Sequence, residues 1–195
     1  HISAYSLTVE PSTALFNLVK NKHILMPNEK IDIKQFLITK DILLKNDYHQ
    51  YEISNYSKKE MECKHNLHYW NLDPYLSFGP SAHSYNLKSR WWNHRSLDTY
   101  IQNISKKTLP TECKEILKKE DNYNEKILNG LRLAKGIKIS LIKQYHNKKY
   151  NTYITKLKNK WDCIDIDNNY IKLINNGMLF VDEISSDMFI TNYQE

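Results

Sequence analysis

The chain lacks the features that mark secreted and membrane-spanning proteins. None of its apolar runs approaches the roughly 20 residues needed to cross a bilayer, and no basic-then-apolar leader opens the sequence. Cysteine is scarce, because only Cys63, Cys113 and Cys163 are present, and their odd number and wide spacing fit neither a disulfide framework nor a zinc site. Reduced thiols are typical of cytosolic proteins, so we expect a cytoplasmic location with at most peripheral membrane contact.

A strong excess of one charge is also lacking. The 28 lysines and arginines exceed the 22 acidic residues only moderately, and most of the excess is lysine spread along the chain. This distribution predicts a solvated surface rather than a nucleic-acid footprint. Hydrophobic residues make up 41% of the sequence, which is enough for a packed core, and 195 residues suit one compact domain or two small ones.

The first third has the pattern of a parallel α/β layer. Residues 1–9 form a strand with largely uncharged side chains on both faces, which is typical of a buried parallel strand. An amphipathic helix is expected at about 28–46, followed by a short strand at 51–56. A buried strand needs neighbours on both sides, so we expect further strands to precede His1.

The middle of the chain is rich in aromatic residues and poor in periodicity. This stretch, 57–95, holds three of the four tryptophans. Ser96 can cap a helix over about 97–106. Residues 106–119 form a polar connector that contains a proline, so a domain boundary is expected near residue 110.

The remainder predicts a small winged-helix-like domain of helices and a hairpin. Asn122 and Glu125 fit a capping box, Gly136 fits a helix C-cap, and Ser140 can cap a second helix. The expected elements are helices at about 122–134, 140–145 and 151–161, a hairpin at 163–173, and a last apolar segment with a helix at 177–188.

The hairpin can be aligned residue by residue. A two-residue type I′ turn is expected at Asn168-Asn169, because asparagine tolerates positive φ. The alternation of apolar and polar residues along the two strands then places apolar side chains on the buried face and opposite charges on the solvent-exposed face. The predicted cross-strand pairs are Ile166 with Ile171, Ile164 with Leu173, and Asp165 with Lys172.

Six strings occur in an order and spacing that resemble one family. They are His1 to Pro11, Tyr51 to Tyr56, His65 to Trp70 (the pattern HNxxYW), Gly79 to Ser84, Arg90 to Asn93, and Gly130 to Leu133 followed by Gly136-Ile137. The chain resembles the HemW branch of the radical-SAM, oxygen-independent coproporphyrinogen III oxidase-like family. The resemblance implies an α/β fold, with the end of a radical-SAM partial (β/α) barrel in residues 1–110 and a HemN-type, winged-helix-like domain in residues 111–195.

The resemblance implies two functions. The first is haem binding and trafficking of the HemW type, with transfer to a respiratory apoprotein. The second is coproporphyrinogen III dehydrogenation in porphyrin biosynthesis. The HNxxYW string favours the first. The resemblance leaves a homodimer open.

The family's iron–sulfur motif is missing from the chain. Members hold a [4Fe-4S] cluster through Cys-x-x-x-Cys-x-x-Cys, which leaves one iron open to S-adenosyl-L-methionine, and no such string occurs in this sequence. The chain alone is therefore expected to bind no cluster and to perform no radical catalysis.

The resemblance also assigns site residues. For haem these are His65, as the iron ligand, with Asn66, Tyr69 and Trp70, because imidazole is an axial ligand and aromatic rings offer a flat apolar surface. His68 is a less favoured ligand, since it occupies a variable position of the motif. The alternative is a set of packed histidine and tryptophan side chains.

Three further residues border the S-adenosyl-L-methionine pocket by the same resemblance, namely Tyr5, Thr8 and His83. Core packing is the alternative for Tyr5, and a hydrogen-bonded loop residue is the alternative for His83. Glu52 is expected to pair with Arg90 or Arg95. The lysines of the helix at 151–161 are expected to be solvated, because the acidic hairpin beside them would repel phosphates.

Overall fold

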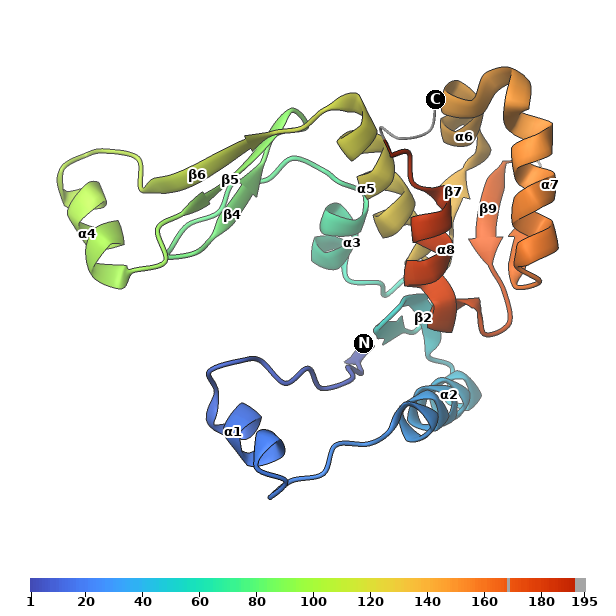
Figure 1. Ribbon diagram of the computed structural model, residues 1–195, viewed down its shortest axis with the longest axis horizontal. Coiled ribbons are helices and arrows are strands. Elements are labelled where there is room, and N and C mark those ends of the chain that lie inside the picture. Colours follow the sequence, from blue (N-terminus) through green and yellow to red (C-terminus); the bar gives the residue numbers. More distant parts are fainter. Residues whose placement is uncertain (168, 192–195) are drawn as a thin grey trace. The chain divides into compact units, whose positions relative to one another are not determined.

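The computed structural model describes residues 1–167 and 169–191, and the chain divides into two compact units, residues 1–63 and 64–195. Figure 1 shows the course of the chain through both. Three separate three-stranded sheets are present in the described residues, and every strand pair in them is antiparallel.

The first unit contains one of these sheets and two helices. Its elements are β1 (Ile2–Ser3), α1 (Ala14–Lys20), α2 (Glu29–Lys45), β2 (His49–Glu52) and β3 (Asn55–Ser57), and the strand order is β1-β3-β2. The helix expected at 28–46 is confirmed, and the Asn28 side chain accepts a hydrogen bond from the Ile31 amide at 3.0 Å.

Two expectations for this unit are wrong. The first strand is antiparallel to β3 and ends at Ser3, so it is not a buried parallel strand over residues 1–9. The strand expected at 51–56 is a tight hairpin, because the chain reverses at Ile53-Ser54 and returns as β3. Uncharged side chains on both faces therefore mark a peripheral segment in this unit, and not a central strand.

The core of the first unit is small and partly polar. Its buried side chains all lie in the hairpin and are Tyr51, Glu52, Asn55, Tyr56 and Ser57. Neither α1 nor α2 contains a buried residue. The apolar stripe predicted for α2 is only partly covered, because Ile33, Phe36 and Leu37 are half-buried and Leu44 is 50% exposed.

The second unit begins with a short helix and an antiparallel sheet. Its first elements are α3 (Lys64–Trp70), β4 (His83–Tyr85), β5 (Ser89–Asn93), α4 (Leu97–Ser105) and β6 (Thr111–Ile116), and the strand order is β4-β5-β6. Figure 1 shows α4 in the connection between β5 and β6. The predicted Ser96 cap is confirmed, since its hydroxyl accepts from the Thr99 amide at 3.3 Å.

The polar connector predicted at 106–119 is wrong over residues 111–116. These residues form β6, which pairs with β5 through Trp91 opposite Lys114 and Trp92 opposite Cys113. The segment has four charged or polar side chains, one cysteine and one isoleucine, but backbone pairing with a neighbouring strand does not require an apolar pattern. Periodicity alone could not reveal it.

The winged-helix-like domain is confirmed. Its elements are α5 (Lys119–Leu131), β7 (Ile137–Lys138), α6 (Ile139–His146), a 3₁₀ turn (Asn147–Lys149), α7 (Tyr150–Lys160), β8 (Ile164–Ile166), β9 (Tyr170–Leu173), a second 3₁₀ turn (Gly177–Phe180) and α8 (Val181–Met188). The strand order is β7-β9-β8. All three predicted hairpin pairs occur at the predicted register, and the expected turn includes residue 168, which lies outside the described residues.

The core of this domain is apolar and closed. Tyr123, Ile127 and Leu131 of α5 are fully buried, as are side chains on α6, β9 and α8. Gly136 has φ +74°, and a Cβ there would lie 2.1 Å from the Ile171 carbonyl oxygen. Only glycine fits this turn.

Three predicted caps in the domain are wrong. The helix α5 begins at Lys119, and the Asp121 carboxylate accepts from the Lys118 amide at 2.8 Å, so the capping pair is not Asn122 with Glu125. This start was predicted too late because the first residues of α5 are polar and carry no apolar periodicity. The same helix ends at Leu131 with Arg132 as its C-cap, so Gly136 lies in the turn after the cap, and helix α6 begins at Ile139, before Ser140.

Candidate haem site on helix α3

The HNxxYW string forms α3, and the end of this helix is closed by the backbone. Leu72 adopts a left-handed conformation with φ 56°. Its amide donates to the Tyr69 carbonyl at 3.0 Å, and the Asp73 amide donates to the His68 carbonyl at 3.0 Å. This pair of hydrogen bonds is the Schellman motif, and Pro74 after it prevents the helix from continuing.

His65 presents an accessible imidazole. Its side chain is exposed, and no described residue forms a hydrogen bond with its ring nitrogens. Tyr69, one turn along the helix, contacts the ring edge-on, with 5.0 Å between ring centroids and an interplanar angle of 88°. The alternative of a histidine packed in a core is therefore not what the structure shows for His65.

The His65–Tyr69 pair continues into a row of aromatic rings. Tyr69 meets Tyr75 at a centroid distance of 4.8 Å, and Tyr75 meets Tyr85 at 6.1 Å. Tyr75 and Tyr85 also exchange both backbone hydrogen bonds, each at 2.9 Å, so the chain after α3 is tied to β4. We call His65, Tyr69, Tyr75 and Tyr85 the aromatic row.

The buried end of the aromatic row is anchored by charge. Arg90 lies over the Tyr85 ring at 5.4 Å from its centroid and donates to Glu125 of α5 at 2.8 Å. Burial and the Glu125 charge raise the pKa of Tyr85, so its hydroxyl stays protonated. Burial opposes the charge of Arg90, but the Glu125 carboxylate outweighs it and raises the Arg90 pKa. One end of the row is thus fixed, while the His65 end is open.

His68 is held by a carboxylate. Its Nδ1 lies 2.6 Å from Asp73 Oδ2, and both side chains are exposed. Sequence reasoning missed Asp73 and the role of Tyr75. The Leu72-Asp73-Pro74 string did signal a helix end, but only the Schellman turn brings the carboxylate back beside His68.

The four residues predicted for haem lie on one helix. His65 and Tyr69 are exposed, whereas Asn66 and Trp70 are half-buried. An accessible imidazole beside a row of edge-on and tilted aromatic rings offers a nitrogen ligand for a haem iron and apolar surface for a porphyrin. Among the described residues, no group of three or more histidine, cysteine or acidic side chains could hold a metal ion.

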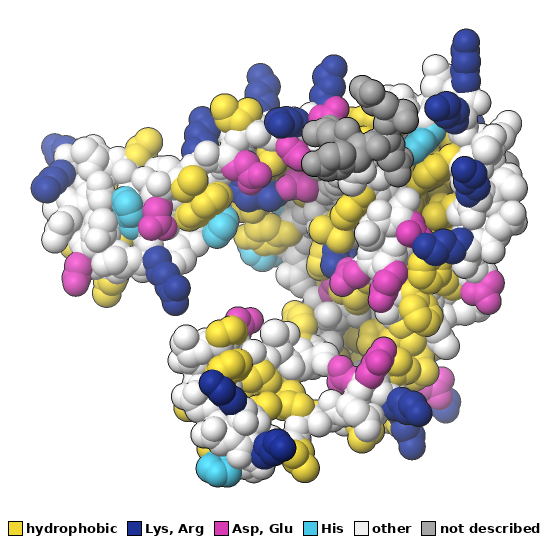
Figure 2. Space-filling view, in the orientation of Figure 1, with side chains coloured by type: hydrophobic (Ala, Val, Ile, Leu, Met, Phe, Trp, Pro, Cys, Tyr) yellow, Lys and Arg dark blue, Asp and Glu magenta, His cyan; other side chains and the backbone are white. Residues whose placement is uncertain are grey.

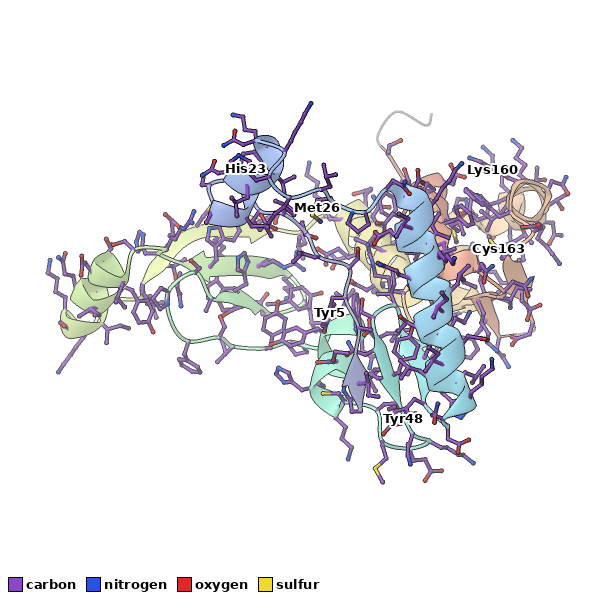
Figure 3. All side chains as sticks on the ribbon, turned by 90° about the horizontal axis from the view of Figure 1, so that it is seen from below. Tyr5, His23, Met26, Tyr48, Lys160 and Cys163 are labelled. Carbon is purple, nitrogen blue, oxygen red and sulfur yellow. The ribbon has the colours of Figure 1, made fainter. Side chains whose placement is uncertain are left out.

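The residues assigned to S-adenosyl-L-methionine are divided between the two units. Tyr5 and Thr8 follow β1 in the first unit and are both exposed, and Tyr5, labelled in Figure 3, is 71% exposed rather than packed in a core. His83 begins β4 in the second unit and stacks on Trp92, at 5.3 Å between centroids and 25° between planes. Their assignment stays a prediction.

The expected partner of Glu52 is wrong. Its carboxylate accepts from Asn55 Nδ2, while Arg90 pairs with Glu125. Glu52 is fully buried and its Oε2 has no partner among the described residues. Burial raises the pKa of the Glu52 carboxyl group, and the hydrogen bond from Asn55 offsets this rise only in part.

The lysines of α7 are solvated, as expected. Lys156, Lys158 and Lys160 are exposed, and Lys160 pairs with Asp187 of α8. Figure 2 shows basic side chains scattered over the drawn face among acidic and uncharged ones. No helix in the described part of the chain is both long and apolar enough to span a membrane.

Comparison with known proteins agrees with the resemblance. Residues 117–180 match the family model described as the HemN C-terminal domain. The chain is 35% identical over 137 residues to a protein named heme chaperone HemW from Bacillus subtilis, covering 70% of this chain and 36% of that protein. It is 31% identical over 170 residues to the protein of the same name from Lactococcus lactis, covering 82% and 43%.

A solved structure shares the fold. It is that of Escherichia coli coproporphyrinogen III oxidase (HemN), described as a radical SAM enzyme, with a TM-score of 0.61, 14% identity, and coverage of 84% of this chain and 42% of that one. The predicted fold class is thereby confirmed. The chain spans less than half the length of each of these three relatives. Its residues 117–180 match the HemN C-terminal domain family, and the chain as a whole is similar in sequence to part of the heme chaperones named HemW.

Proposed function

We propose that this chain binds haem on α3, through His65, as part of a haem-trafficking protein of the HemW type. The observation that carries the proposal is the exposed His65 imidazole, which has no hydrogen-bond partner among the described residues and stands at the open end of the aromatic row. The names of the relatives support haem as the ligand rather than another planar molecule.

The roles of the side chains follow from their positions. His65 would supply a nitrogen lone pair to the iron, which provides the coordination chemistry when haem is bound. Tyr69 holds the imidazole edge-on and limits its rotation, and Tyr75 supports Tyr69. The Arg90–Glu125 pair fixes the far end of the row on α5.

The wider activity is part of the same proposal. The complete protein would carry a [4Fe-4S] cluster and bind S-adenosyl-L-methionine with Tyr5, Thr8 and His83 near its pocket, and it would transfer haem to a respiratory apoprotein in the cytoplasm. The three cysteines of this chain lie fifty residues apart in sequence, so they do not form the motif that would hold the cluster.

A haem titration tests the ligand. The wild-type chain should give a shifted Soret band on binding haem, and His65→Ala should weaken binding by roughly 10- to 100-fold. His23→Ala, which removes another exposed histidine, is the control and should bind as the wild type does. Equal affinities for the wild type and His65→Ala would refute the assignment.

A further inference from the structure

Two histidines, and not one, project from α3 with a nitrogen available for coordination. His65 and His68 are three positions apart, so they are neighbours on the helix surface, and both are exposed. They differ in their partners. His65 contacts only an aromatic ring, whereas His68 is hydrogen-bonded to a carboxylate.

The carboxylate determines which nitrogen of His68 is free. An ionised carboxylate only accepts hydrogen bonds, so the Nδ1–H of His68 donates to Asp73, over 2.6 Å. In the neutral ring Nε2 then carries the lone pair. No described residue forms a hydrogen bond with that nitrogen. Histidines that bind metals are commonly held in this way, with the second ring nitrogen donating to a carboxylate.

The backbone places Asp73 for this role. Asp73 follows His68 by five residues, and on a continued helix its side chain would face away from the histidine. The left-handed Leu72 reverses the chain and brings the Asp73 amide to the His68 carbonyl. This conformation is unfavourable for leucine compared with glycine, and the two hydrogen bonds of the closed turn stabilise it.

We infer that His68 is a second iron-binding position, used in alternation with His65, and that Asp73 is its positioning residue. The inference rests on the proposed function. His65 and His68 lie on one face of the seven-residue helix α3, and each would hold the iron through one ring nitrogen. The two residues would be alternative holding positions for the same iron.

The residual haem binding of a His65→Ala chain tests this inference. This variant should keep a histidine-ligated spectrum, and adding His68→Ala should abolish that spectrum and weaken binding by a further factor of about 10 or more. Asp73→Ala in the same background should also weaken binding, whereas Asp41→Ala, which removes an exposed carboxylate that pairs with Lys45 on α2, should not. Far-UV circular dichroism confirms the folding of each variant.

The outcomes separate the two proposals. If His65→Ala weakens binding but the added His68→Ala and Asp73→Ala change neither affinity nor spectrum, the second position is refuted and the proposed function stands. If His65→Ala has no effect in the wild-type background, the proposed function itself is wrong.

Discussion

The two regions of the second unit use their apolar side chains in opposite ways. In the winged-helix-like domain they fill a closed core, in which Tyr123, Ile142 and Ile184 are inaccessible to solvent. In the region from α3 to β6 several large apolar side chains are open, with Phe78 85% and Ile116 77% exposed. Apolar side chains thus form the core of the terminal domain, while the α3–β6 region presents rings and imidazoles at its surface.

Alanine substitution of one glycine in each region should give the largest difference in folding stability between the two regions. Gly136→Ala in the terminal domain places a Cβ 2.1 Å from a backbone oxygen at positive φ, whereas Gly79→Ala in the α3–β6 region has positive φ but open space. Gly79→Ala should cost about 1–2 kcal/mol. Gly136→Ala should cost a further 1–3 kcal/mol or so, because packed backbone must move. Urea unfolding of the two variants measures the difference, and equal losses would show that the terminal domain is not tightly packed around this turn.

The pH dependence of stability gives a smaller contrast. His146 stacks on Tyr153 at 3.8 Å between ring centroids, and burial lowers its pKa below the ordinary 6.5. The unfolded chain then binds the proton more readily, so this stability is fully present above about pH 6.5 and is lost as pH falls toward the lowered pKa.

Thermal unfolding measured between pH 7.5 and 5 tests whether the chain loses stability on acidification. The wild type should lose stability on acidification, and His146→Gln should lose less of it. A wild-type chain that gains stability toward pH 5, with the gain removed by His146→Gln, would contradict the account.

The success of sequence reasoning differed between the regions for a physical reason. The Ile164–Leu173 and Asp165–Lys172 pairs were predictable because a short hairpin sets its own register and one buried face admits a single alignment. Strand β6 and the antiparallel pairing of β1 depend on partners far away in sequence, and no local pattern marks them.

The residues of the candidate haem site were also only partly predictable from the sequence. His65, Tyr69 and the other motif residues were found by resemblance, and the structure places them on one helix. Tyr75 joins the aromatic row only because it pairs with Tyr85, and Asp73 reaches His68 only through the left-handed Leu72. Neither contact follows from the identity of the residue, since both depend on the path of the backbone after α3.

The most direct test of the central claim, that the iron ligand lies on α3, is the iron–histidine stretching band of the ferrous haem complex in resonance Raman spectra. The band should be present in the wild-type chain, with a frequency that shifts when histidine is labelled with ¹⁵N, and it should be absent when both His65 and His68 are replaced by alanine. A band of unchanged frequency and intensity in that double variant would place the ligand elsewhere in the molecule and contradict the account.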